Sequence, residues 1–537
     1  MNHIKEIIAE GKTFLGIEFG STRIKAILID EKYAPIASGS YEWENQLIDG
    51  IWTYHLEAIW KGLQECYMSL AQEVHKQYGI YLEKVAAIGI SGMMHGYMAF
   101  GKEGELLVPF RTWRNTITKD AASELTKVFD FNIPQRWSIA HLYQAILNKE
   151  PHVGKIDYIT TLAGYIHWKL TGEKVLGIGE ASGMFPIDSE KKQYNSKMME
   201  QFQELEQVRD FEWKLEDILP KVMIAGQLGG VLTEEGAKLL DISGKLSSGI
   251  PLAPPEGDAG TGMTATNSVA PRTGNVSAGT SIFAMVVLEK ELQKVYEELD
   301  MVTTPSGDAV AMVHGNNCTS DLNAWVGLFR EFSELLENRT NVNEIYQKLY
   351  INSLNGEKDA GGLLAFNCYS GEPIIGLDAG MPLFMHGPNT QMNLANFIRA
   401  HLYAALAVLK MGCDILFKQE NVKVDTVYGH GGFFKTEGVG QSILADALNV
   451  PVAVMKTAGE GGPWGMALLA AFMIEKQETE TLEHFLEKRV FVTDTKKLVL
   501  PDLDGVQGFD RYMERYKQAI AVEKMASGLF TRGDKSC

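Results

Sequence analysis

The chain has 537 residues, a length that predicts about two to four domains with well-filled cores. Its 50 Lys and Arg residues against 68 Asp and Glu residues give a net charge of -18, which argues against a protein that wraps nucleic acid or coats an anionic membrane. Hydrophobic residues make up 45% of the chain and charged residues 22%, so a fibrous or disordered protein is excluded and small-molecule partners are favoured.

The cysteines are scattered, with no CxxC pair and no histidine at ligand spacing, so neither a disulfide framework nor a zinc site is expected. The N-terminal residues carry charges throughout, and no stretch approaches the roughly 20 apolar residues that a membrane span needs. We therefore expect a soluble, cytoplasmic protein.

Two segments far apart in the chain share one pattern. Residues 14–30 form two short apolar runs joined by a Gly-Ser-Thr turn at 20–22, which predicts a β-hairpin. Residues 274–287 place a Gly-Thr-Ser turn, 279–281, between similar runs. The similarity suggests a duplicated architecture, although such turns are common in any mixed fold.

The remaining patterns indicate α/β structure. Residues 85–90 predict a buried strand, and the Pro/Gly-rich stretch 249–262 is the best candidate for a domain boundary. Residues 393–417 predict a long, mostly buried helix, and 424–428 a short strand that enters a glycine cluster. The tail from about residue 476 is charged and partly helical, and the simplest organisation is two α/β lobes with a cleft between them.

Glycine-rich turns after strands suit a phosphate tail, because their backbone N–H groups can approach it closely. The chain has neither GxxxxGK[ST] nor a GxGxxG that opens a helix, which disfavours P-loop and Rossmann binding. Any one turn is more often a plain connection than a phosphate site. The candidate phosphate turns contain Gly20, Ser21, Thr22, Gly279, Thr280, Gly431 and Gly432.

Two carboxylates could take part in chemistry. Asp258 lies among small residues that would let a substrate come close, and phosphoryl transfer to a hydroxyl uses such a general base; an Asx-turn is the alternative. Glu18 lies in an apolar strand, where a carboxylate needs a cation, a metal or donors unless it points to solvent.

Polar and aromatic residues follow the predicted strand 85–90, at the edge of an open α/β sheet where ligands usually bind. His95 could hydrogen-bond a polyol or serve a structural role, and Trp113 could stack on a sugar or anchor the surface. The candidate acceptor-binding residues are Met94, His95, Gly96, Trp113, Arg114, Asn115 and Asp258.

Taken in order, these segments resemble the FGGY carbohydrate kinases of the actin/hexokinase-like ATPase superfamily, and most of all their xylulokinase- and ribulokinase-like pentulose kinases. The string of matches is far more specific than any single one. The residues that carry the resemblance are FLGIEFGSTRIKAILID (14–30), GISGMMHGYMAF (89–100), YIHWKLTGE (165–173), GIPLAPPEGDAGTGM (249–263), GNVSAGTSIF (274–283), VYGHGGFFKTEGVGQSILADALNVPV (427–452) and GEGGPWGMALLAA (459–471).

The resemblance implies an α/β fold of two duplicated ribonuclease-H-like lobes with a central cleft that holds ATP and Mg2+. It assigns residues 1–255 to an N-terminal lobe and 256–475 to a C-terminal lobe. Residues 476–537 would form a helical tail, and the resemblance does not say against which lobe it packs. It further implies transfer of the terminal phosphoryl group of ATP to a sugar hydroxyl, with Asp258 as the base and Glu18 at the position that helps to hold the metal. The glycine turns would face the phosphates, while Gly431, Gly432 and Phe433 would border adenine and ribose.

Several residues depart from the family pattern: Glu18 where the family usually has an aspartate, Ala259 after the catalytic aspartate, Asn115 in place of an aspartate, and His430 within the adenosine motif. The acceptor is therefore expected to be a ketopentose such as xylulose, with ribulose, another ketose, a polyol or a sugar acid paired with Arg114 as alternatives. A non-catalytic actin-fold ATPase is the rival from another class. A homodimer is expected from the family alone.

Overall fold

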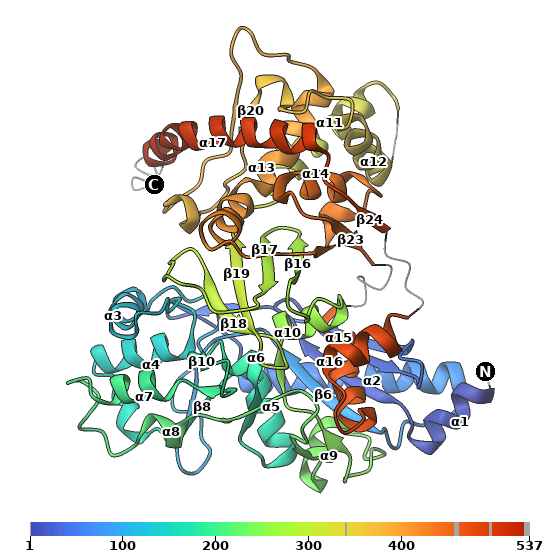
Figure 1. Cartoon of the computed structure of the whole chain (residues 1–537). Helices are drawn as coiled ribbons and strands as arrows, with labels where there is room; N and C mark the ends of the chain where they lie inside the picture. Colours follow the sequence, from blue (N-terminus) through green and yellow to red (C-terminus); the bar gives the residue numbers. More distant parts are fainter. Residues whose placement is uncertain (1, 339–340, 456–460, 493–496, 531–537) are drawn as a thin grey trace. The chain divides into compact units, whose positions relative to one another are not determined.

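The computed structural model describes residues 2–338, 341–455, 461–492 and 497–530. The chain folds into two compact units, each discontinuous in sequence (Figure 1). The first unit contains Met1–Pro271, Lys294–Val310 and Glu460–Thr493, and the second contains Arg272–Gln293, Ala311–Gly459 and Asp494–Cys537.

These units differ from the continuous ranges 1–255, 256–475 and 476–537 expected from the sequence. The difference has a physical reason: β15 (Glu256–Gly257) pairs with a strand of the first sheet, and α15 (Gly461–Glu475) packs on that same sheet. Strand pairing and burial, rather than chain order, assign both segments to the first unit.

The first unit is built on a sheet with the strand order β13-β14-β6-β1-β2-β3, and β15 also pairs with β6. β1 and β2 form the hairpin that residues 14–30 predict, while β6 runs parallel to β1 with Phe19 opposite Gly92. The strands are β1 (Phe14–Phe19), β2 (Arg23–Ile29), β3 (Pro35–Glu42), β6 (Ala87–Gly92), β13 (Gly230–Val231) and β14 (Pro251–Leu252).

The second unit repeats this order. Its sheet runs β19-β17-β16-β22-β23-β24, so that β19-β17-β16-β22-β23 corresponds to β3-β2-β1-β6-β14. β16 and β17 form the second predicted hairpin, and β22 is parallel to β16. This is the duplication that the two turn motifs indicate. The strands are β16 (Thr273–Ala278), β17 (Ile282–Val287), β19 (Ala309–Gly315), β22 (Thr426–His430), β23 (Val452–Val454) and β24 (Lys497–Val499).

Helices cover the apolar strands of each sheet. In the first unit α2 packs on β3 and β2, and α15 packs on β1 and β6. Both β1 and β6 are almost continuously buried, as strands with helices on their faces are. The main helices of the first unit are α1 (Asn2–Glu10), α2 (Leu56–Tyr78), α3 (Lys119–Phe129), α4 (Ser138–Leu147), α5 (Leu162–Thr171), α6 (Ile178–Ala181), α7 (Ser196–Gln203), α8 (Leu215–Ile218), α9 (Glu234–Leu240), α10 (Asp258–Ala265), α15 and α16 (Leu482–Phe485).

The close packing of α15 depends on glycines. A Cβ atom at Gly16 of β1 would lie 2.0 Å from the carbonyl oxygen of Pro463, and one at Gly465 of α15 would lie 2.0 Å from that of Thr261 in α10. Both contacts are with backbone atoms, which cannot rotate away. Because these positions lack side chains, α15 approaches both the sheet and α10 closely.

The predicted long helix is α13 (Leu394–Asp414), which is buried along most of its length. Together with the turn that follows it, the segment Leu394–Gln419 is long and apolar enough to cross a membrane, contrary to the expectation that no such stretch exists. Its most apolar window is 83% buried inside the protein, and Arg399, His401 and Lys410 are buried along it. The burial is that of a core helix.

The tail divides between the two units. Residues up to 493 belong to the first, whereas α17 (Leu503–Phe530) packs on α14 and β20 (Leu364–Phe366) of the second. The Tyr512 hydroxyl lies 3.1 Å from the carbonyl oxygens of both Ala365 and Ala400, which fixes α17 against the core. The other main helices of this unit are α11 (Ser320–Leu335), α12 (Val342–Ser353) and α14 (Val439–Leu448).

Gly465→Ala should destabilise the first unit by about 2 kcal/mol or more, because an added methyl group overlaps a carbonyl oxygen and forces α10 and α15 apart. Urea unfolding followed by tryptophan fluorescence measures the effect. Gly154→Ala is the matched control, since a Cβ atom there meets nothing within 4 Å. Equal unfolding midpoints for the two variants would contradict the role of this contact.

Candidate active site

Three parallel strands of the first unit end at one edge of the sheet and bring the predicted residues together there. Glu18 near the end of β1 lies opposite Ser91 of β6, and Gly257 of β15 lies opposite Gly92. Asp258 follows at once as the first residue of α10. The carboxyl ends of parallel strands are where open α/β sheets bind ligands, so this edge is the candidate site.

Asp258 is held at the N-terminus of α10 with its side chain exposed to solvent. Its Oδ1 accepts a hydrogen bond of 3.2 Å from the Met94 N–H, which links the predicted base to the predicted acceptor segment. Crowding by protein atoms raises the pKa of Asp258, while the N–H groups of Met94 and Ala259 lower it. The carboxylate is thus more basic than an ordinary aspartate and remains accessible.

The acceptor segment has an unusual backbone. His95 and Gly96 both adopt positive φ angles, 70° and 95°. This conformation is uncommon for a residue with a side chain, and strain of this kind collects at binding sites. The His95 ring is buried near Trp137, with centroids 6.3 Å apart, and its Nδ1 lies 3.2 Å from the Gly183 carbonyl oxygen. Nδ1 must carry a proton to donate to that carbonyl, which sets the tautomer of a neutral ring.

Two further carboxyl groups lie behind Asp258, and the sequence reasoning missed both. Glu256 is buried and accepts hydrogen bonds from the N–H groups of Glu180 (2.9 Å) and Gly179 (3.3 Å); burial raises its pKa to about 7. Glu180 is fully buried. Burial raises the pKa of Glu180 well above its usual value, with Asp258 and Glu256 adding to the effect, whereas a hydrogen bond with the Thr161 side chain lowers it.

A signal for these two residues was present in the sequence. Glu180 is a single acid among small and apolar residues in GIGEASG, as Glu18 is in its strand, and Glu256 lies in the similar segment APPEGDAG with Asp258 as the one other acid. The same argument that singled out Glu18, that a carboxylate in an apolar segment needs a partner, applies to Glu180 and Glu256.

Glu18 completes the group of acids. Burial, with a smaller contribution from the Asp258 carboxylate, raises its pKa to about 7, although Lys25 opposes this. Its Oε1 lies so close to Gly462 that a Cβ atom there would be 2.1 Å away. Two neighbouring carboxylates that repel one another suit a divalent cation, which would favour the ionised form of both.

No cluster of three or more His, Cys, Asp or Glu side chains with metal-binding geometry occurs among the described residues. A hard cation such as Mg2+ is commonly held by one or two carboxylates, with phosphate and water oxygens as its other ligands. Glu18, with Asp258 nearby as a second negative charge, therefore fits an ion that arrives with a nucleotide.

The first phosphate turn, between β1 and β2, is tethered by two aromatic side chains that the sequence reasoning missed. Trp43 donates its Nε1–H to the Gly20 carbonyl (2.7 Å), and the Tyr54 hydroxyl donates to the Ser21 carbonyl (2.5 Å). The rings of Trp43 and Tyr54 stack with centroids 4.1 Å apart. These contacts fix the carbonyl side of the turn, and Thr22 remains exposed.

The second phosphate turn, between β16 and β17, is held in the same manner within the second unit. Thr319 donates to the Gly279 carbonyl through both its N–H (3.1 Å) and its hydroxyl (2.8 Å). The Cys318 N–H donates to the Thr280 carbonyl at 2.9 Å. Both turns therefore have their carbonyl oxygens bound to the framework, the arrangement expected where backbone amides serve an anion.

The predicted adenosine residues follow β22, the neighbour of β16. Gly431 has a φ of 100°, and a Cβ atom there would lie 2.4 Å from the Ala278 carbonyl oxygen, so the two glycine turns of this unit are adjacent. A Cβ atom at Gly432 would meet nothing within 4 Å. Phe433 is fully buried against Tyr350, so its side chain supports the turn rather than bordering a ligand.

The segment after residue 112 gives a different role to one predicted residue. Asn115 is buried, and its amide is fully engaged: Oδ1 accepts the Trp52 N–H (2.9 Å), while Nδ2 donates to the carbonyls of Trp52 (2.8 Å) and Thr112 (2.9 Å). Asn115 therefore holds the backbone of Trp52 in place, and its side-chain amide has no free N–H group for a sugar. Arg114 stacks on the Trp52 ring, and Trp113 is 38% exposed.

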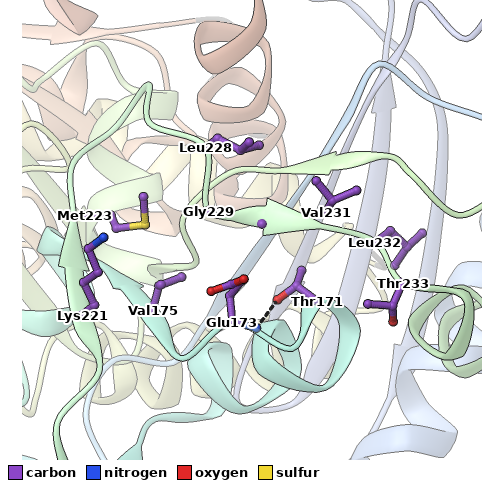
Figure 2. A pocket seen from close by; sticks show the side chains of 11 residues that line it. Thr171, Glu173, Val175, Lys221, Met223, Leu228, Gly229, Val231, Leu232 and Thr233 are labelled. Atoms are coloured by element: carbon purple, nitrogen blue, oxygen red, sulfur yellow. Dashed lines mark hydrogen bonds between the residues drawn. The ribbon is translucent and has the colours of Figure 1, made fainter. Parts of the chain in front are cut away.

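A separate pocket of about 560 Å³ lies beside β13 in the first unit (Figure 2). Glu173, Lys221, Met223 and Leu228 are among the residues that line it, and the Glu173 N–H donates to the Thr171 hydroxyl at 3.0 Å. None of the residues predicted from the sequence lines this pocket. The candidate site is therefore the strand edge at Asp258.

Comparison with known proteins decides the family. The model of the N-terminal domain of the FGGY family of carbohydrate kinases matches residues 13–261, and that of the C-terminal domain matches 274–474. The chain belongs to the FGGY family of carbohydrate kinases. It is therefore an ATP-dependent sugar kinase that uses a divalent metal, and an ATPase without a sugar substrate is set aside.

Two bacterial relatives of this FGGY kinase span nearly its whole length. The xylulose kinase of Haemophilus influenzae is 22% identical over 515 residues, which cover 94% of this chain and 98% of the relative. The xylulose kinase of Lactococcus lactis is 22% identical over 524 residues, which cover 94% and 95%.

Solved structures of kinases share the fold. A ligand-bound xylulose kinase from Lactobacillus acidophilus superposes with a TM-score of 0.77 at 17% identity, covering 97% of this chain and 100% of that one. A gluconate kinase from the same species gives a TM-score of 0.76 at 18% identity, covering 97% and 99%. At these identities the likeness establishes the two-domain α/β fold.

The stability of the Glu18→Gln variant should increase relative to that of the wild-type protein as the pH rises. A carboxyl group whose pKa is raised on folding keeps a proton that the unfolded chain has already lost, so it costs stability as pH rises from about 4.5 to about 7. Glutamine has no such cost. Melting temperatures at about pH 5 and pH 8 measure the effect, with the exposed Glu216→Gln as control. If Glu18→Gln differs from wild type by the same shift in melting temperature at both pH values, the claim that burial raises the pKa of Glu18 is wrong.

Proposed function

We propose that this FGGY kinase transfers the terminal phosphoryl group of ATP to a hydroxyl group of a ketopentose such as xylulose. The observation that carries the proposal is the hydrogen bond between Asp258 and the Met94 N–H, because it joins a solvent-accessible base to the segment expected to bind the sugar. The two xylulose kinases that align over almost the whole chain support this choice of acceptor.

Asp258 acts as the general base. It removes the proton from the acceptor hydroxyl as that oxygen forms a bond to the γ-phosphorus; the bond from this phosphorus to the β-phosphate bridging oxygen breaks, and ADP leaves. The raised pKa of Asp258 increases its affinity for that proton. Most of the rate would come from alignment of the two substrates and stabilisation of charge.

The other predicted residues bind and orient the substrates in this proposal. Met94, His95 and Gly96 would contact the sugar, with His95 fixed by Gly183. The backbone amides of the turns at 20–22 and 279–280 would bind the phosphates of one ATP molecule. Gly431 and Gly432 would border the nucleoside, while Phe433 supports them from the core.

The metal is proposed to be Mg2+, with Glu18 holding it together with the phosphates and water. Such an ion neutralises charge on the phosphate oxygens. Glutamate is one methylene longer than the aspartate usual in the family, so its carboxylate would displace the ion or remove a bridging water.

The cellular setting is also proposed. An acidic chain with a small-molecule substrate fits the cytoplasm, with neither a membrane nor a nucleic acid as partner. A homodimer remains a prediction from the family resemblance.

A screen of purified protein with ATP and Mg2+ tests the substrate class. Ketopentoses, ketohexoses, polyols and sugar acids are supplied one at a time, and ADP release is coupled to NADH oxidation. We expect xylulose to give the highest kcat/KM among the neutral sugars. Absence of sugar-dependent ADP release with every acceptor would refute the proposed function.

Asp258→Asn should lower kcat by about 10²–10⁴-fold, because the amide keeps the size of the side chain but accepts no proton. The affinity for ATP, measured by calorimetry, should change little, since Asp258 faces the acceptor segment. Asp217→Asn, an exposed position in α8, is the control. Retained turnover in Asp258→Asn would remove this residue from the mechanism.

A further inference from the structure

A short segment of the first unit, residues 177–183 (GIGEASG), lies between the strand that leads to Asp258 and the acceptor segment, residues 94–96. It contains α6, which has only four residues and therefore little stability of its own. The first N–H groups of a helix have no partners within the helix, so the position of α6 depends on what binds these groups from outside.

Glu256 supplies that partner. Its buried carboxylate accepts hydrogen bonds from the N–H groups of Glu180 (2.9 Å) and Gly179 (3.3 Å). Because Asp258 follows two residues after Glu256, these bonds fix α6 to the stretch of backbone that carries the proposed base.

The other end of the segment orients His95. The Gly183 N–H donates to the Glu180 carbonyl at 3.0 Å, and the Gly183 carbonyl oxygen lies 3.2 Å from Nδ1 of His95. Hydrogen bonds thus run in series from the Glu256 carboxylate through the backbone of Glu180 and Gly183 to the His95 ring. A displacement of α6 would move the carbonyl group that orients this ring.

The three glycines of the segment show how closely it is built around these two side chains. A Cβ atom at Gly177 would lie 2.2 Å from Oε1 of Glu256, and one at Gly179 would lie 2.5 Å from Oε2. A Cβ atom at Gly183 would lie 2.7 Å from Nδ1 of His95. Each glycine therefore lies where the carboxylate or the histidine needs its space.

A second support of α6 does not replace Glu256. The Thr303 hydroxyl donates to the Ile178 carbonyl (3.1 Å), and the Thr303 N–H donates to the Ser182 hydroxyl (3.1 Å). Neither bond involves the N–H groups of residues 179 and 180. In the part of the chain that the structure describes, Glu256 is the acceptor for both, so its removal would leave two buried donors unpaired.

We propose that Glu256 is a positioning residue for the acceptor: it holds α6, and through α6 it keeps His95 in the orientation that binds the sugar. The proposal rests on the proposed kinase function and adds a buried residue that acts through another. The effect should fall on the acceptor rather than on ATP, because the phosphate turn at 20–22 is tethered by Trp43 and Tyr54 and not by α6.

The test measures kcat and the KM values of the acceptor and ATP in Glu256→Met, Glu256→Gln and Gly183→Ala, with the best acceptor of the substrate screen. In Glu256→Met the acceptor KM should rise roughly ten- to a hundredfold, since two buried donors lose their acceptor, while the ATP KM changes less than threefold. Glu256→Gln should recover most of the loss, because its amide oxygen still accepts hydrogen bonds. Gly183→Ala should raise the acceptor KM with Glu256 in place, because the added methyl group displaces His95.

Asp241 provides the matched control. It is a buried carboxylate of the same unit that also accepts backbone hydrogen bonds, from the N–H groups of Ser243, Lys245 and Leu246 at 2.9 Å. None of these donors belongs to α6 or to the acceptor segment. Asp241→Leu should lower the melting temperature as Glu256→Met does, yet leave both KM values unchanged.

Hydrogen exchange followed by mass spectrometry tests the same link without turnover. In Glu256→Met, exchange should become faster at residues 177–183 and also at residues 94–96. In Asp241→Leu, exchange at both segments should match wild type.

An unchanged acceptor KM in Glu256→Met, or an equal loss of affinity for acceptor and ATP, would overturn the inference. Faster exchange confined to residues 177–183 would overturn it as well. Should Glu256→Met fail to fold, Glu256→Asp takes its place, because its shorter side chain draws the carboxylate back from the two N–H groups; a wild-type acceptor KM in that variant would contradict the proposal. A wild-type enzyme that phosphorylates no acceptor refutes the proposed function instead, and the exchange experiment then decides whether Glu256 holds the acceptor segment.

Discussion

The close approach of α15 to the first sheet is the constraint on which the site depends. The helix contacts β1, β6 and α10 at once, and it can do so because Gly16 and Gly465 place no side chain between backbones. The strand that carries Glu18 and the helix that begins at Asp258 are therefore fixed against one common element. A sugar kinase needs such rigidity, because alignment of base, acceptor and phosphate supplies much of its rate.

This packing also explains why acids can gather where they do. Glu180 and Glu256 are buried behind Asp258 and Glu18, in a region where all four groups cannot easily be ionised together. Protonation of Glu180 and Glu256 relieves the repulsion where no water is available. A divalent ion can relieve it at Asp258 and Glu18. Burial thus separates two inner acids, Glu180 and Glu256, from the two that we propose face the substrates, Asp258 and Glu18.

Much of this arrangement could be predicted from the sequence, since hairpins, turns and the position of Asp258 follow from local pattern and family resemblance. What could not be predicted depends on contacts between distant segments. The engagement of Asn115 with Trp52 turns a presumed sugar donor into a support, and the burial of Phe433 removes it from the ligand surface. The discontinuous units have the same origin, because α15 packs where its glycines allow rather than where chain order suggests.

A crystal structure of the kinase with xylulose and a non-hydrolysable ATP analogue tests the central claim most directly. The account predicts an acceptor hydroxyl within hydrogen-bond reach of the Asp258 carboxylate, at roughly 2.6–3.2 Å, with phosphate oxygens on the amides of the turn at 20–22. A sugar bound elsewhere, or an Asp258 side chain that reaches no hydroxyl while the nucleotide is in place, would contradict it.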